Sequence, residues 1–98
     1  MKIIVLGGDG FCGWASSLRL SSKGHEVFIF DNLSRRKIDK ELKASSLTPI
    51  KSIYQRLKVW NKINKNKIKF YKIDVSKEIL RLEKLIKKIN PDTIIHFA

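Results

Sequence analysis

Near its amino terminus the chain reads Lys2-Ile3-Ile4-Val5-Leu6-Gly7-Gly8-Asp9-Gly10-Phe11-Cys12-Gly13. The first five of these residues are nearly all apolar, which is typical of a parallel strand buried on both faces. The glycines after them predict a turn. A helix is predicted from Phe11 to Lys23 because apolar residues recur at helical spacing, namely Phe11, Trp14, Ala15 and Leu18. Gly24 can end this helix, since glycine adopts the left-handed conformation without steric cost.

The rest of the chain repeats the alternation of strand and helix. Strands are predicted at residues 26–31, 68–74 and 93–98, and Ser76 can cap a helix over about residues 77–89. Strands that alternate with helices favour a parallel sheet with right-handed crossovers. The predicted fold class is therefore α/β: a Rossmann-type, doubly wound parallel sheet that is incomplete and contains the first four strands.

A long insertion of about residues 36–66 separates the second and third predicted strands. It exceeds the length of an ordinary connection and is predicted to hold two helices. The first is short and charged, around residues 35–43. The second starts with Thr48 as its N-cap and Pro49 at the first helical position, where a missing N–H costs nothing. Its predicted apolar face consists of Ile50, Ile53, Leu57, Trp60 and Ile63.

The chain stops inside or just after the fourth predicted strand. Such a strand would lack its next neighbour and its covering helix, which leaves an apolar face and an unpaired edge. We therefore expect residues 1–98 to be the truncated amino-terminal part of a longer protein.

Length and composition restrict the class of protein. A chain of 98 residues forms one small domain with a modest core. Its single cysteine excludes an internal disulfide and fits a reducing compartment. No apolar run approaches the roughly 20 residues of a transmembrane helix, so no membrane insertion is expected. No targeting peptide is visible, and we expect a cytoplasmic location, or the plastid stroma if a transit peptide has been lost.

The formal net charge of +12 permits two interpretations. One is a nucleic-acid-binding surface. The other is a set of solvated helix faces rich in lysine. The lysines are scattered, and aromatic residues do not interleave with basic ones as they do on a single-strand-binding platform. We therefore expect no nucleic-acid partner, and a basic nucleic-acid-binding protein remains a distant alternative.

Gly7, Gly10 and Gly13 form a spaced triplet between a predicted strand and a predicted helix. In dinucleotide-binding folds the first glycine permits the tight turn, the second lets the backbone approach a pyrophosphate, and the third lets helix and strand pack closely. The helix N-terminus offers N–H groups and partial positive charge to the phosphates. The triplet alone is a weak signal, because a generic glycine-rich turn has the same composition.

Asp31 strengthens the dinucleotide interpretation. It ends the second predicted strand, about 20 residues after the glycines, where a carboxylate accepts hydrogen bonds from the ribose hydroxyls of NAD. The alternative role is a helix cap or a solvated turn acid. The charge of Asp31 would repel a 2′-phosphate and favours NAD over NADP, although Arg35 and Arg36 could hold that phosphate. Asp74, at the tip of the third strand, either closes an adenine pocket with Val75 or is a plain helix-capping acid.

The spacing Gly-x-x-Gly-x-x-Gly is similar to that of the extended short-chain dehydrogenases. Further segments narrow this resemblance: residues 7–15, 31–36 and 46–53, Arg56 and Trp60, and the terminal His96-Phe97-Ala98. Together they resemble the nucleotide-sugar epimerase/dehydratase family, in its sulfolipid-biosynthesis branch of UDP-sulfoquinovose synthases. The resemblance covers essentially the whole chain, and the insertion segment Leu47-Thr48-Pro49-Ile50 is its most specific part.

This resemblance implies a full-length enzyme that uses a tightly held NAD to convert UDP-glucose and sulfite into UDP-sulfoquinovose, and that forms a homodimer. Another NAD-dependent sugar epimerase or dehydratase, and a non-catalytic nucleotide-binding module, are the alternatives. The resemblance also assigns cofactor contacts by position: the pyrophosphate to Gly10, Phe11 and Cys12, the adenosine ribose to Asp31, Asn32 and Arg35 with Arg36 at its flank, and the adenine to Asp74 and Val75.

The catalytic residues are expected to be absent from residues 1–98, so this chain alone is predicted to be inactive. The resemblance places a Thr and a Tyr-x-x-x-Lys pair downstream of the fourth strand. Tyr54 and Lys58 have that spacing, but they precede the third strand and are interpreted as an exposed pair on a helix. Cys12 is either a nucleophile at a helix N-terminus or a packing residue. His96 either lies near the cofactor or makes a structural hydrogen bond, and no set of residues has metal-site spacing.

Overall fold

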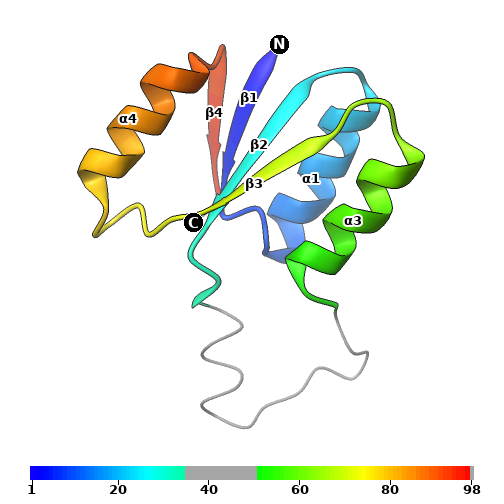
Figure 1. Cartoon of the computed structure of the whole chain (residues 1–98), viewed down its shortest axis with the longest axis horizontal. Coiled ribbons are helices and arrows are strands. Elements are labelled where there is room, and N and C mark those ends of the chain that lie inside the picture. The colour runs from blue at the N-terminus through cyan, green and yellow to red at the C-terminus, as the bar shows by residue number, and fades with distance from the viewer. Residues whose placement is uncertain (35–50, 98) are drawn as a thin grey trace, which may run out of the picture.

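The structure is a computed structural model that describes residues 1–34 and 51–97. Within these residues four parallel strands form one sheet, and helices cover both of its faces (Figure 1). In chain order the elements are β1 (Lys2–Leu6), α1 (Phe11–Ser22), β2 (Glu26–Asp31), α3 (Ile53–Ile63), β3 (Ile68–Lys72), α4 (Ile79–Ile89) and β4 (Thr93–His96). The predicted α/β class with a parallel sheet is confirmed.

The strand order is β3-β2-β1-β4, with β1 in the interior of the sheet. Leu6 at the end of β1 lies beside Phe30 of β2 on one side and beside His96 of β4 on the other. Every pair is parallel, so the carboxyl ends of the strands meet at one edge. In such sheets a ligand binds outside the carboxyl ends, where the strand order reverses. The topology therefore favours a binding site beside the turn that follows β1.

Two apolar clusters lie on opposite faces of the sheet, one under α1 and α3 and the other under α4 (Figure 1). Successive side chains of a strand point to opposite faces, so neighbouring residues of β1 and β2 alternate between the clusters. Consequently β1 is buried on both faces, as predicted. The first cluster contains Ile3, Val5, Val27, Ile29, Ile53, Leu57 and Ile68, and the second contains Ile4, Leu6, Phe28, Phe30, Ile73 and Ile89.

The predicted apolar face of α1 is confirmed in part, because Trp14 and Leu18 are partly buried against the first cluster, but the fully buried residues of the helix are small. Gly13, Ser17 and Ser21 are buried, whereas Phe11 and Ala15 are exposed. The Ser17 hydroxyl donates to the carbonyl oxygen of Gly13 at 2.7 Å, which satisfies the hydroxyl inside the core. Because these side chains are short, the helix backbone can lie close to the sheet and to the turn before it.

The helix α3 begins later than predicted. Its N-cap is Ser52, whose hydroxyl accepts the N–H of Gln55 at 3.3 Å, while Oε1 of Gln55 accepts the N–H of Ser52 at 3.3 Å. This reciprocal pair is a capping box, and it explains a start at Ile53 rather than at Pro49. Outside the described residues lie Thr48, Pro49, Ile50 and the helix predicted around residues 35–43.

The predicted apolar face of α3 is confirmed in its first half. Ile53 and Leu57 are buried in the first cluster. Trp60 is partly buried and donates from Nε1 to the hydroxyl of Ser21 on α1 at 3.1 Å. Ile63 is 71% exposed, so its assignment to the face was wrong. The helix therefore packs on both the sheet and α1, and Ile63 at its end is exposed to solvent.

Both boundaries around Asp74 differ from the prediction, since β3 ends at Lys72 and α4 begins at Ile79. The Asp74 carboxylate accepts the N–H groups of Ser76 and Lys77, and this arrangement makes a turn before the helix. Ser76 is therefore not the N-cap of α4, and its hydroxyl donates to Asp74 instead. The fourth strand is also shorter than predicted, because the described chain leaves the strand conformation after residue 96.

The side chain of Asn61, on α3, pairs with the backbone of β3. Its Oδ1 accepts the N–H of Ile68 at 2.8 Å, and its Nδ2 donates to the carbonyl oxygen of Ile68 at 3.0 Å. Because β3 is at the edge of the described sheet, these bonds take the place of a neighbouring strand. Asn61 therefore links α3 to the sheet, although no sequence pattern indicated this contact.

We predict that Asn61→Ala lowers the free energy of unfolding by about 1–3 kcal/mol, because the backbone groups of Ile68 lose both partners. Urea denaturation followed by far-ultraviolet circular dichroism measures the loss. Lys62→Ala, at an exposed position of the same helix, is the control and should change stability by less than about 0.5 kcal/mol. Equal losses in the two variants would show that the Asn61 contact contributes nothing.

Candidate functional site

The turn after β1 requires glycine at Gly7 and Gly13 for steric reasons. Gly7 has φ of 84°, in a region that other residues rarely adopt. A Cβ at Gly13 would lie only 2.2 Å from the carbonyl oxygen of Gly7, which is far inside van der Waals contact. These two glycines are therefore fixed by the packing of the turn against the first turn of α1.

Gly10 is not required by the fold in the same way. Its φ of −71° is open to any residue, and a Cβ there would meet only the Gly7 carbonyl oxygen, at an ordinary 3.5 Å. Gly10 is the N-cap of α1, and the first N–H groups of a helix have no partners within the helix. The missing side chain leaves this helix end accessible, and the helix dipole favours an anion at that place.

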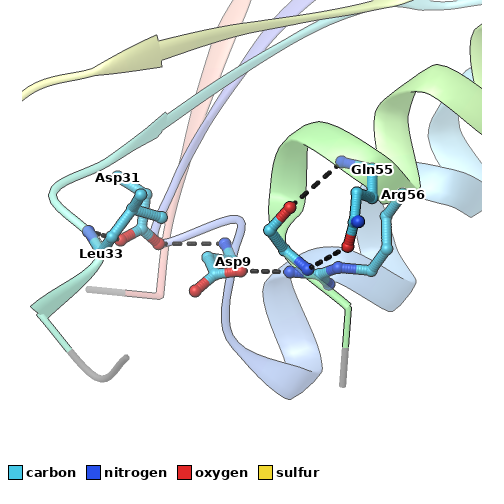
Figure 2. A network of polar contacts seen from close by, with 6 residues as sticks. Asp9, Asp31, Leu33, Gln55 and Arg56 are labelled. Atoms are coloured by element: carbon cyan, nitrogen blue, oxygen red, sulfur yellow. Dashed lines mark hydrogen bonds and ion pairs between the residues drawn. The ribbon is translucent and has the colours of Figure 1, made fainter. Parts of the chain in front are cut away.

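Asp31 holds the turn against the end of β2. Its Oδ2 accepts the N–H of Asp9 at 2.9 Å, and its Oδ1 accepts the N–H of Leu33 at 2.7 Å (Figure 2). Leu33 has φ of 60°, so the chain turns sharply after β2. Each carboxylate oxygen can accept more than one hydrogen bond, so these contacts leave capacity for a ligand hydroxyl. The turn-acid role of Asp31 is therefore compatible with ribose binding.

Asp74 lies just after β3, and the next residues hold its carboxylate. Its Oδ1 accepts bonds from the hydroxyl of Ser76 at 2.6 Å and from the N–H groups of Ser76 at 3.0 Å and Lys77 at 3.2 Å. The Ser76 hydroxyl above all, with a smaller contribution from the Asn32 side chain, holds the pKa of Asp74 below its usual value. Asp74 is therefore ionised at neutral pH. Asp74 is a turn acid rather than the predicted helix cap, because the N-cap of α4 is Glu78, and contact with an adenine stays a prediction.

The glycine turn and the ends of β2 and β3 border one cleft of about 420 Å³. It brings together most of the predicted cofactor residues, namely Gly7, Gly10, Asp31, Asn32, Asp74 and Val75. The sequence had not singled out the other residues that line it, which are Asp9, Phe30, Ser34, Ile73, Ser76 and Phe97. All of these follow or end a strand at the carboxyl edge of the sheet, and that position was the available signal.

Some predicted residues do not line the cleft. Phe11 and Cys12 are exposed in the first turn of α1, and Gly13 is buried against the glycine turn. The assignment of Phe11 and Cys12 to the pyrophosphate therefore concerns their backbone and the helix end, and Gly13 has the close-packing role predicted for it. Arg35 and Arg36 lie outside the described residues.

Tyr54, Lys58 and His96 are also outside the cleft lining. The ring of Tyr54 packs edge-on against Phe70 of β3, with 5.3 Å between centroids, and Tyr54 is 55% exposed. Lys58 is exposed as well, which agrees with their interpretation as a surface pair. Among the described residues, no three His, Cys, Asp or Glu side chains are grouped to hold a metal ion. In residues 1–34 and 51–97, no helix has the length and apolar character needed to cross a bilayer.

One ion pair beside the glycine turn was not anticipated from the sequence. Nη2 of Arg56, on α3, donates to Oδ1 of Asp9, and the two side chains are only 14% and 2% exposed (Figure 2). The Arg56 guanidinium also lies over the ring of Trp14, 4.6 Å from its centroid. The pair joins residues far apart in the chain, so no local pattern could reveal it. It ties α3 to the glycine turn.

Comparison with known proteins gives relatives over nearly the whole chain. The model of the NAD dependent epimerase/dehydratase family matches residues 3–98. Chloroplastic UDP-sulfoquinovose synthase of Spinacia oleracea is 42% identical over 97 residues, which cover 99% of this chain and 20% of that protein. UDP-sulfoquinovose synthase of Sulfolobus acidocaldarius is 37% identical over 98 residues, with 100% and 25% covered. The chain thus spans a quarter or less of these curated relatives.

Solved structures of other proteins have a fold similar to that of this chain. UDP-glucose 4-epimerase from Bifidobacterium longum, in complex with NAD⁺ and UDP, matches with a TM-score of 0.71 and 28% identity, covering 100% of this chain and 24% of that one. The likeness confirms the Rossmann-type architecture expected from the alternating strands and helices. With residues 3–98 inside the family model, the chain belongs to the NAD-dependent epimerase/dehydratase family.

Proposed function

We propose that this chain binds NAD in the cleft between the glycine turn and the ends of β2 and β3. The observation that carries the proposal is at Gly10, where the fold has room for a side chain and a glycine instead leaves the cleft and the end of α1 open. Asp31 lines the same cleft and keeps hydrogen-bonding capacity for a ribose. Family membership and the NAD⁺-bound neighbour from Bifidobacterium longum support this proposal.

The proposed contacts follow the polarity of the cleft. The pyrophosphate lies at the N-terminus of α1, where backbone N–H groups and the helix dipole stabilise its charge. Bound NAD would supply the hydride acceptor and donor of the reaction. The residues proposed to contact it are Gly7, Gly10, Phe11, Cys12 and Gly13 at the pyrophosphate, Asp31, Asn32, Arg35 and Arg36 at the ribose, and Asp74 and Val75 at the adenine.

Two glycine variants separate binding from folding. We predict that Gly10→Ala keeps the circular dichroism spectrum but binds NAD at least about tenfold more weakly, because a Cβ separates the phosphate from the backbone. Gly13→Ala should instead lose structure, since its Cβ overlaps the Gly7 carbonyl group. Isothermal titration calorimetry measures the affinity. Unchanged NAD affinity in folded Gly10→Ala would contradict the proposed site.

Asp31 should also select between the two nicotinamide cofactors. We predict that the chain binds NAD at least about tenfold more tightly than NADP, because the 2′-phosphate would lie beside an ionised carboxylate. Competition of each cofactor against a fluorescent NAD analogue measures the ratio. Equal or tighter binding of NADP would contradict the role of Asp31 and would favour phosphate binding by Arg35 and Arg36.

We propose further that the whole protein modifies a nucleotide sugar as a homodimer, with UDP-glucose and sulfite as substrates and UDP-sulfoquinovose as product. The support is 42% identity to the UDP-sulfoquinovose synthase of Spinacia oleracea, against 36% identity to a UDP-glucose 4-epimerase of Neisseria meningitidis, each over 99% of this chain. No Tyr or Lys lines the cleft within the described residues. The proposed role of residues 1–98 is therefore to bind and orient the cofactor. Proton transfer at the sugar is proposed for residues outside this segment.

Chimeras test this second proposal. Residues 1–98 replace the matching segment of the Spinacia oleracea enzyme, and formation of UDP-sulfoquinovose from UDP-glucose and sulfite is measured. We expect kcat/KM within about tenfold of the parent, and no product when Gly10→Val is added. The same segment placed in the Bifidobacterium longum epimerase should support less of its parent activity. The reverse preference would favour the epimerase alternative.

A further inference from the structure

The cleft carries negative charge where the proposed ligand is also negative. Three carboxylates line it, those of Asp9, Asp31 and Asp74. No Lys or Arg lines it within residues 1–34 and 51–97. These carboxylates would repel a bound phosphate, and the repulsion is stronger for a carboxylate that is buried away from water.

Asp9 directly precedes Gly10, the N-cap of α1 at which the pyrophosphate is proposed to bind. Its side chain is 2% exposed, so water screens its charge poorly. Its N–H is already bonded to Asp31, which fixes the backbone of the turn at that residue. An uncompensated charge at Asp9 would therefore oppose a phosphate bound at the end of α1.

Arg56 supplies the compensating charge from α3. Its guanidinium forms the ion pair with Asp9 (Figure 2) and also lies over the ring of Trp14. Trp14 belongs to the first turn of α1, where its N–H bonds to the Gly10 carbonyl oxygen at 2.9 Å. One side chain therefore contacts both the acid of the glycine turn and the helix end at which the phosphate would bind.

We propose that Arg56 is a positioning residue of the cofactor site, which neutralises Asp9 and holds the glycine turn in the conformation that accepts a dinucleotide pyrophosphate. This inference rests on the proposed NAD-binding function. It makes α3, an element of the insertion, part of the cofactor site even though Arg56 itself does not line the cleft.

The ion pair could instead only dock α3 on the fold, and the phosphate dependence of binding separates the two roles. NAD carries a pyrophosphate, whereas adenosine presents the same base and ribose without charge. If α3 is only misplaced, the chain binds both ligands more weakly by the same factor. If charge compensation is lost, only the affinity for NAD falls, because adenosine has no phosphate for Asp9 to repel.

The experiment titrates NAD and adenosine into the chain and follows amide chemical shifts by nuclear magnetic resonance, which also reports whether each variant is folded. We expect Arg56→Met to weaken NAD by about tenfold and adenosine by less than about twofold. Lys58→Met is the matched control, because it removes one positive charge from an exposed position of the same helix. It should leave both affinities unchanged.

A second variant restores the charge balance. Adding Asp9→Asn to Arg56→Met removes the buried carboxylate and keeps the N–H that bonds to Asp31. We expect NAD affinity to return to within about threefold of the unmodified chain, and this double variant also serves if Arg56→Met alone does not fold. Arg56→Lys, which keeps the charge, should retain the ratio of NAD to adenosine affinity.

Three results would overturn the inference while leaving the proposed function in place. They are unchanged NAD binding by folded Arg56→Met, parallel losses for NAD and adenosine, and a double variant that folds but does not regain NAD affinity. If the unmodified chain is folded and binds neither probe, the proposed function fails and the inference fails with it.

Discussion

The close contact between Gly13 and the backbone of Gly7 determines where the first helix begins. A Cβ at Gly13 would lie 2.2 Å from the Gly7 carbonyl oxygen, so only glycine lets α1 start this close to the end of β1. The close packing continues along the helix at the buried residues Ser17 and Ser21, whose short side chains let α1 lie near the sheet. The N-terminus of α1 consequently lies at the carboxyl edge of the sheet. The cleft, which both the glycine turn and Asp31 line, depends on this placement.

A second constraint is the chain of polar contacts that runs across the top of the sheet. Asp31 at the end of β2 accepts the N–H of Asp9, and the carboxylate of Asp9 accepts a bond from Arg56 of α3. Removing one partner of a buried ion pair such as Asp9–Arg56 costs about 3–5 kcal/mol. The turn is therefore held from both sides, by a strand end and by a helix. Such rigidity suits a site in which backbone N–H groups must be oriented before the ligand arrives.

The sequence predicted those parts of the site that depend on local patterns. An apolar strand, spaced glycines and a strand-tip acid each leave a signature within a few residues, so β1, the turn and Asp31 were found. The buried side of α1 was missed because large apolar residues such as Phe11 suggested a face that close packing assigns to small ones. The start of α3 was misplaced because Thr48-Pro49 and Ser52-x-x-Gln55 are both helix-start signals, and only the second is seen to cap. The Asp9–Arg56 pair joins separate elements, and a single sequence does not reveal such a pair.

The glycines of the turn are present for two different reasons, backbone packing and access to the helix end, and this explains why the triplet alone is a weak signal of cofactor binding. Gly7 and Gly13 are required by the backbone whether or not anything binds, whereas Gly10 has no such requirement. Asp9 adds a further requirement, because a nearly buried carboxylate beside a phosphate site needs a cation close by. That cation comes from Arg56 on α3. The ion pair therefore links α3 to the glycine turn by charge, and the contact of Arg56 with the ring of Trp14 links the same side chain to the first turn of α1.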